Sequence, residues 1–168
     1  MDKPDIMGLV EVQTKQLTGD ALDWAVAFAM GWQLVFANFH SSGIRPSTPV
    51  PEWAKSYIAG VKLTGYEIER GAYWLDRENQ VVREAYMPGC ETYQTPFAPT
   101  SDWRDTGPMI ERFQLDVFDM QDGDWWACNR LGGGESTAPQ EAICRGAVDV
   151  ALGETVRVPA VLLQRVAA

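Results

Sequence analysis

The sequence LDVFDMQDGDWWACNRL, Leu115 to Leu131, carries a strong short-range signal for secondary structure. Residues 115–120 and 125–131 alternate between apolar and polar side chains, as half-buried β-strands do. The residues between them include Asp122-Gly123, and an Asp-Gly pair between alternating segments is typical of a tight hairpin turn. We therefore expect two antiparallel strands in this stretch.

The residues that follow the hairpin predict a loop, a helix and a short strand. Three consecutive glycines, Gly132 to Gly134, are expected to form a flexible loop. Thr137 is a good capping residue for a helix that runs to Leu152 and is ended by Gly153. Thr155 to Val158 then alternates as a final strand.

The N-terminal part predicts a strand followed by a buried helix. Leu9 to Gln13 alternates as a strand, and a helix is expected between a capping Thr18 and a terminating Gly31. This helix is apolar nearly all round, which is typical of a helix enclosed in a core. Asp23 is its only charged residue past the first helical position. Its carboxylate is either stabilised by the nearby helix N-terminus or receives a hydrogen bond from a loop or a ligand.

The middle of the chain gives weaker signals. Gln33 to Phe39 is expected to form a strand, Ser41 to Val50 a loop, and Pro51 to Ile58 a short helix. A hairpin is expected with its turn at Asp76 to Asn79. Met87 to Pro99 contains three prolines and is expected to be irregular.

Together these patterns predict an α+β fold in one domain that spans residues 1–168. We expect a small, mostly antiparallel sheet. The helices Thr18–Met30 and Thr137–Leu152 should pack on it.

The charge of the chain limits its partners. With 23 acidic and 14 basic side chains the formal net charge is −9, which disfavours non-specific binding to nucleic acid or anionic lipid. A local site for a small anion remains open, because ten of the 14 cations are arginines and the guanidinium group suits phosphate and carboxylate. No apolar run reaches 18 residues, so we expect no membrane span.

Cysteine and histidine usage argues against a metal site. The three cysteines are widely spaced, no C-x-x-C pair occurs, and His40 is the only histidine. A zinc site of the His/Cys kind is therefore not expected, nor is any cofactor, and a catalytic triad would have to use His40. With no signal peptide in the sequence, we expect a reduced cytoplasmic protein.

The stretch from Phe97 to Trp126 is dense in aromatic, basic and acidic residues, which is typical of a ligand-facing loop. Ser101 is expected to cap one short helical turn and Pro108 to begin another. Trp103 either closes the core beneath this loop or offers its indole to a flat ligand beside Arg104. The candidate ligand-binding residues are Asp102, Trp103, Arg104, Glu111, Arg112 and Trp126.

Two of these segments also carry a resemblance to a known family. LTGDALDWAVA at Leu17–Ala27 and PTSDWRDTGPMIER at Pro99–Arg112 resemble motifs of the NinX-like family of phage proteins, and GETVRVP at Gly153–Pro159 is similar to the family's terminal motif. Thr106 stands where the family often has a glycine, and residues 32–95 form a longer middle segment than is usual. The resemblance implies a phage or prophage origin, the cytoplasm of an infected bacterium, and an accessory role. It implies no known activity.

No hydrolase or nucleotide-binding signature occurs, so three hypotheses remain. The first is a non-catalytic phage accessory protein that sequesters a small nucleotide-derived host signal in counter-defence, with a homo-oligomer as one form in which it could act. The second is a protein-interaction module that inhibits a host enzyme. The third is a metal-dependent hydrolase that uses Asp102, Asp105 and Glu111.

Overall fold

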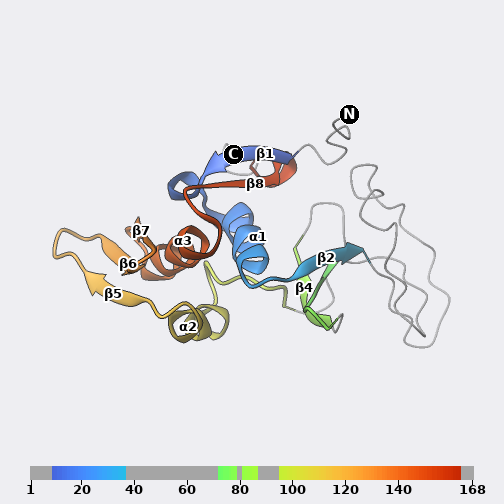
Figure 1. The fold of residues 1–168 in the computed structure, drawn as a ribbon, viewed down its shortest axis with the longest axis horizontal. Helices are drawn as coiled ribbons and strands as arrows, with labels where there is room; N and C mark the ends of the chain where they lie inside the picture. Colours follow the sequence, from blue (N-terminus) through green and yellow to red (C-terminus); the bar gives the residue numbers. More distant parts are fainter. Residues whose placement is uncertain (1–8, 37–71, 79–80, 87–94, 164–168) are drawn as a thin grey trace. The chain divides into compact units, whose positions relative to one another are not determined.

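A computed structural model describes residues 9–36, 72–78, 81–86 and 95–163 (Figure 1). The expected loop at 41–50, the helix at 51–58 and His40 lie outside the described residues. The chain divides into two compact units, which are described separately below. The first comprises Met1–Leu9 and Gly31–Phe97, and the second comprises Val10–Met30 and Ala98–Ala168. The expected single domain over 1–168 stays a prediction.

The first unit contains a three-stranded antiparallel sheet in the order β2-β3-β4. Its strands are β2 (Gln33–Phe36), β3 (Ala72–Leu75) and β4 (Val81–Ala85). The expected hairpin is confirmed, because β3 and β4 pair across the turn that begins at Asp76. Trp74 is fully buried, and the ring of Phe97 meets that of Trp32 edge-on at 4.9 Å.

The second unit is built around two long helices, α1 (Gly19–Ala29) and α3 (Pro139–Leu152), which pack against each other. A two-stranded sheet joins β1 (Leu9–Gln13) and β8 (Thr155–Pro159). The 3₁₀ turn η1 (Thr14–Gln16) follows β1, and the short helix α4 (Ala160–Leu163) follows β8. The remaining elements are helix α2 (Trp103–Arg112) and the strands β5 (Asp116–Asp119), β6 (Trp125–Asn129) and β7 (Gly132–Ser136).

Helix α1 forms where the sequence predicts it and is buried along most of its length. Gly31 has a φ of 80°, a conformation that favours glycine, and so ends the helix as expected. Thr18 is the N-cap residue, although its side chain makes no capping hydrogen bond. Trp24 is buried and stacks on Phe28 with ring centroids 4.5 Å apart.

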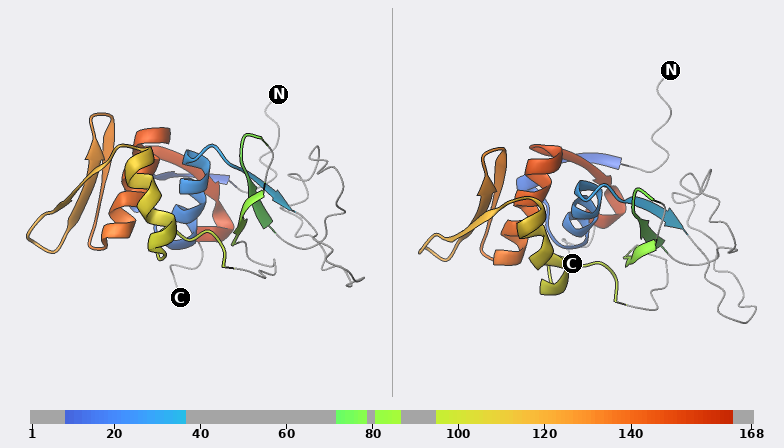
Figure 2. Two further views of the ribbon diagram at one scale, coloured as in Figure 1. Left: turned by 90° about the horizontal axis from the view of Figure 1, so that it is seen from below. Right: turned by 60° about the horizontal axis from the view of Figure 1, so that its bottom comes forward.

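Strands β5, β6 and β7 form an antiparallel sheet with α3 against one face (Figures 1 and 2). The β5–β6 hairpin confirms the prediction, but the expectation of a flexible loop at Gly132–Gly134 is wrong, because these glycines belong to β7. The reason is the close approach of the helix. A Cβ at Gly134 would lie 2.7 Å from the carbonyl oxygen of Ala142, and closer still to Arg145 and Gly146. Only glycine lets strand and helix meet at this distance.

Two side chains of α3 satisfy the free edge of β7. The backbone N–H of Gly133 donates to Oδ2 of Asp149 at 2.9 Å, and Nη1 of Arg145 donates to the carbonyl oxygen of Glu135 at 2.6 Å. Unpaired groups on an edge strand invite pairing with another chain. Asp149 and Arg145 therefore occupy one donor and one acceptor of this edge and hinder strand addition there.

Two short turns were expected at 102–112, and this prediction is wrong. The residues form one helix, α2, with Pro108 inside it and with Asp102 instead of Ser101 as N-cap. Likewise, Ala138 and not Thr137 precedes the first turn of α3. In α3, Pro139 occupies the first helical position, where its missing N–H removes no intrahelical bond.

The α+β fold with antiparallel pairing and two main helices is confirmed. The strands, however, form three small sheets where one was expected.

Candidate functional site

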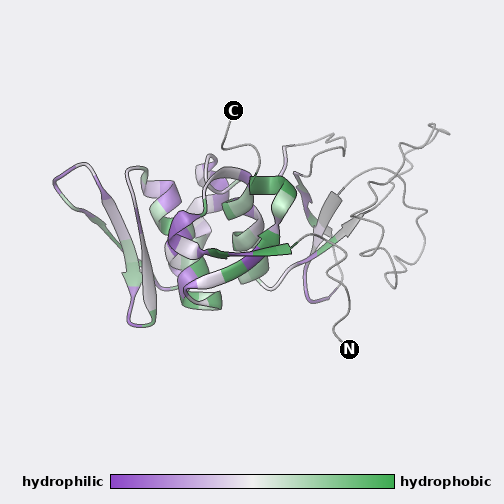
Figure 3. Cartoon of the chain, turned by 90° about the horizontal axis from the view of Figure 1, so that it is seen from above, coloured by the Kyte–Doolittle hydropathy of each residue, from purple (hydrophilic) through white to green (hydrophobic). Residues whose placement is uncertain are grey.

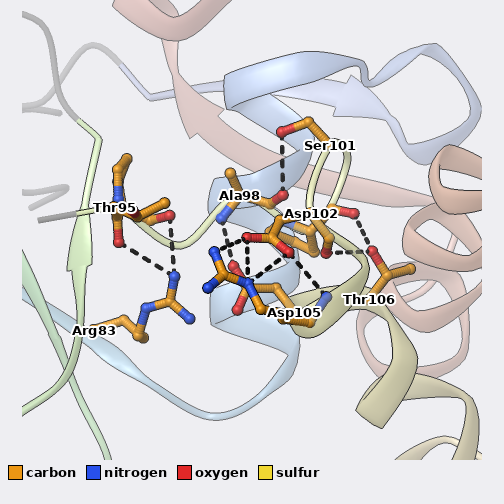
Figure 4. Close-up of polar contacts among 10 residues, drawn as sticks. Arg83, Thr95, Ala98, Ser101, Asp102, Asp105 and Thr106 are labelled. Atoms are coloured by element: carbon orange, nitrogen blue, oxygen red, sulfur yellow. Dashed lines mark hydrogen bonds and ion pairs between the residues drawn. The ribbon is translucent and has the colours of Figure 1, made fainter.

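Buried carboxylates anchor the loop that leads into α2. Asp23 of α1 accepts a hydrogen bond from the backbone N–H of Thr100 at 2.8 Å. Asp105 of α2 accepts one from the N–H of Ala98 at 3.1 Å (Figure 4). Both carboxyl groups belong to residues less than a tenth exposed. The alternative in which Asp23 receives a hydrogen bond from a loop is thereby confirmed.

Thr106 fixes the same loop from the other side. Its hydroxyl group is buried and donates to the carbonyl oxygen of Pro99 and, at 2.9 Å, to that of Asp102 (Figure 4). Asp23 lies in one family-like motif, and Asp105 and Thr106 lie in the other. The two motifs therefore hold a common loop in place.

Burial raises the pKa of Asp23 from 3.8 to about 7. The main cause is loss of solvation, reinforced by the negative charges of Asp20 and Asp105, while the hydrogen bonds from Thr100 act in the opposite direction. Burial also raises the pKa of Cys144 well above its ordinary value, and the nearby Asp23 adds to this rise. Near neutral pH the buried carboxyl group of Asp23 is therefore present in both its protonated and its ionised form.

Asp102 caps α2 and binds Arg104. Its Oδ1 accepts from the backbone N–H of Arg104 at 2.9 Å, and its Oδ2 pairs with Nη2 of the same residue at 2.6 Å. This pairing raises the pKa of the exposed Arg104 guanidinium. An anion at this helix N-terminus would have to compete with a carboxylate that is already in place.

The solvent-exposed face of α2 carries four of the six candidate residues. Trp103 is 52% exposed, so the interpretation in which it closes the core is wrong. Arg104, Glu111 and Arg112 are also exposed, while Asp105, Thr106 and Met109 are buried on the opposite face. We call Trp103, Arg104, Pro108, Glu111 and Arg112 the α2 face. Its two ends are about 13 Å apart, at 1.5 Å per residue.

Arg112 forms a hydrogen bond with the C-terminal end of α1. Its Nη2 donates to the carbonyl oxygen of Met30 at 3.0 Å, and its guanidinium lies 5.9 Å from the ring centre of Phe113. Neither contact blocks the α2 face, since Arg112 remains exposed.

The three carboxylates of the metal hypothesis do not converge. Asp105 points into the core, Asp102 caps the helix, and Glu111 lies near the far end on the exposed face. Among the described residues, no group of three or more histidine, cysteine or acidic side chains is placed to hold a metal ion.

Trp126 belongs to a different part of the second unit. It lies on β6 and borders a cleft of about 910 Å³ beside β7. The lining contains five carboxylates but only two basic side chains, Lys15 and Arg145. Arg145 is held by the carbonyl oxygens of Leu17 and Glu135 and by Glu141. An acidic cleft of this kind does not favour an anionic ligand.

Sequence reasoning did not anticipate this cleft. Its walls come from η1, the hairpin and α3, which are far apart in the sequence. No local pattern marks Lys15, Arg145 and Asp149 as neighbours.

Within the part of the chain that the structure describes, no helix has the length and apolar character needed to cross a membrane. A comparison with curated proteins found no match. A family model described as "Bacteriophage P22, NinX" matches residues 13–148, a span that contains α1, α2 and the loop they hold. The match confirms the resemblance in the two motifs and covers more than half of the chain. The chain therefore belongs to this NinX family of phage proteins.

Proposed function

We propose that this phage protein acts without catalysis, by binding a host protein through the α2 face. The observation that carries the proposal is the 52% exposure of Trp103 on a helix whose opposite side is buried. Tryptophan and arginine are enriched among the residues that dominate binding energy at protein interfaces. On this surface one exposed indole lies at the end of the face, beside charged groups that can form part of a polar rim.

The geometry favours a protein over a small anion as the partner. Small-molecule sites are concave and surround most of the ligand, whereas the α2 face is the outer side of one helix. Asp102 also already caps the helix N-terminus, and its carboxylate forms an ion pair with the guanidinium group of Arg104. A protein partner needs neither a hollow nor an unoccupied helix N-terminus, because it can enclose Trp103 in a pocket of its own.

Inhibition of a host enzyme is the function that such binding would serve. A chain of net charge −9 is attracted to a partner with a basic surface, and this attraction increases the rate of association.

Sequestration of a nucleotide-like host signal is the second candidate. Trp103 and Arg104 are neighbours and both exposed, so a base stacked on the indole would lie close to a guanidinium group. A ligand phosphate would have to displace Asp102 from Arg104. This site would be completed most simply by a second copy of the chain.

The test is a comparison of Trp103→Ala with a matched control, Leu152→Ala. Leu152 is also an exposed apolar residue of the second unit, but it lies on α3. Proteins captured from a bacterial lysate are identified, purified and titrated against each variant. We expect Trp103→Ala to weaken binding at least about 30-fold, as for a residue that contributes about 2 kcal/mol, while Leu152→Ala leaves it unchanged.

The same variants separate the two candidates. If no purified host protein binds, and if nucleotides or cyclic dinucleotides raise the melting temperature of the wild type but not of Trp103→Ala, the second candidate replaces the first. Equal behaviour of wild type and Trp103→Ala with every partner and ligand would refute both.

A further inference from the structure

Among the described residues, no helix covers one face of the β5–β6–β7 sheet. Ala127 is fully buried towards α3, since a Cβ on Gly146 of α3 would touch its carbonyl oxygen at 2.6 Å. Side chains alternate along a strand, so Trp126 and Cys128 point to the opposite face. The register places Phe118 of β5 directly across from Trp126, and directly opposed residues share a face.

Large apolar groups are exposed on or beside this uncovered face. Phe118 is 48% exposed, and Met120, where β5 enters the turn, is 49% exposed. The indole of Trp126 extends across Gly133, where a Cβ would lie only 2.8 Å from its Cζ2. Because Gly133 has no side chain, the indole can lie across β7, on the same face of the sheet as the phenyl ring of Phe118. Exposed apolar surface of this kind is characteristic of interaction sites.

Acidic residues are concentrated in the hairpin that carries this apolar centre. Asp116, Asp119, Asp122 and Asp124 all belong to the hairpin, whereas no lysine or arginine occurs between Arg112 and Arg130. Two of these carboxylates also shape the turn: Oδ1 of Asp119 accepts from the N–H of Gln121, and Oδ1 of Asp122 accepts from that of Asp124. The turn reaches away from the helices of the unit and is mostly hydrophilic (Figures 2 and 3). The hairpin therefore carries an apolar centre together with four negative charges: Asp116 shares the face of Phe118, Asp119 points to the other face, and Asp122 and Asp124 lie at the turn.

We propose that this hairpin face docks on a basic protein, with Phe118 inserted into an apolar pocket that lysine or arginine residues surround. The proposal concerns a second surface and does not depend on the α2 face. Charge complementarity selects this occupant. Nucleic acid carries the same sign of charge as the hairpin, and a second copy would bring four further carboxylates against the first four. A basic partner instead gains attraction from each Asp and buries the exposed rings.

The experiment places a photo-reactive benzoylphenylalanine at position 118 of the full chain and, as a control, at position 10. Val10 is an exposed apolar strand residue of β1, also in the second unit. We expect irradiation in a bacterial lysate to cross-link a basic protein from position 118 but not from position 10. That protein is then purified and titrated against chains without the photo-reactive group.

Three quantities decide the proposal. Phe118→Ala should weaken binding at least about tenfold, as expected for a central interface residue. Asp116→Asn combined with Asp119→Asn should slow association and reduce its dependence on salt. Glu11→Gln combined with Glu154→Gln removes the same charge from exposed positions elsewhere and should change neither.

Several results would overturn the proposal. These are the absence of any cross-linked protein at position 118, or a cross-link to another copy, to a segment of the same chain or to nucleic acid. The proposal would also be overturned if the partner were a neutral or acidic protein and if salt did not weaken its binding. Unfolding curves of all variants identify any loss that reflects a damaged fold.

Discussion

Replacement of Asp23 by Asn should remove a pH-dependent decrease in the free energy of unfolding. The side chain is less than a tenth exposed, and it accepts the N–H of Thr100 from within the core. Asn has nearly the same shape and retains an oxygen for this hydrogen bond, but it never carries charge. The substitution therefore isolates the effect of ionisation from that of packing.

The magnitude follows from the pKa of Asp23, which is 3.8 in its ordinary state and about 7 in the fold. Below pH 3.8 the group is protonated in the folded and unfolded states, so it contributes nothing to pH dependence. Between about pH 4 and 7 the unfolded chain releases the proton while the folded chain retains it, so the free energy of unfolding falls. The difference of about 3 pH units corresponds to about 4 kcal/mol, which is fully expressed above pH 7.

The assay is urea unfolding of wild type and Asp23→Asn at pH values from 4 to 8. The difference between the two free energies should grow by about 4 kcal/mol across this range in favour of Asn, and the melting temperature at pH 8 should rise by about 10 °C. Other titrating groups are common to both proteins and largely cancel in the difference. Glu11→Gln, which removes a carboxylate from an exposed position, serves as the control.

A carboxyl carbon signal of Asp23 that titrates near pH 7 would support the same conclusion by NMR. A difference between the two proteins that stays constant from pH 4 to 8, or a wild type more stable than Asp23→Asn at pH 8, would refute the reasoning.

Four further substitutions test the packing around α2 and α3, each by urea unfolding. Gly134→Ala should destabilise the protein by about 3 kcal/mol, because the new methyl group overlaps α3. Gly107→Ala, which adds the same methyl group to open space in a helix, should instead stabilise it by up to about 1 kcal/mol, and equal effects would contradict the proposed close approach. Thr106→Val should cost about 1–3 kcal/mol, because the carbonyl oxygen of Pro99 loses its buried hydroxyl donor, whereas that of Asp102 keeps the backbone N–H groups of Asp105 and Thr106; no loss would show that the loop does not need the hydroxyl group. Asp102→Ala should cost about 1 kcal/mol through loss of the N-cap, and an unchanged midpoint would count against that role.

Features of the fold that depend only on residues adjacent in the sequence could be predicted from it. Gly31 ends α1 because its own φ is positive, and the Asp122-Gly123 pair marks a turn without help from other segments. The strand at Gly132–Ser136 could not be predicted in this way. Gly134 is required by the close approach of α3, and Gly133 by Cys128 and Trp126 of the neighbouring strand, and these segments meet only in the folded chain.

The same distinction applies to the candidate site. The sequence marked Asp23 as a charge in an apolar helix and allowed a loop donor, and the structure supplies Thr100. It also grouped Trp126 with Trp103 because both fall in one dense stretch. In the folded chain, one lies on β6 beside the cleft and the other on the outer side of α2. Their separation follows from where the hairpin turns, which composition does not reveal.

The contacts of Asp149 and Arg145 with the β7 edge have a consequence for synthesis of the chain. During translation the glycine strand leaves the ribosome before the helix that carries both side chains. Truncated chains that end between residues 137 and 144 would thus expose the unpaired backbone N–H and C=O groups of the β7 edge. Such fragments should self-associate, whereas the protein extended past residue 149 should not.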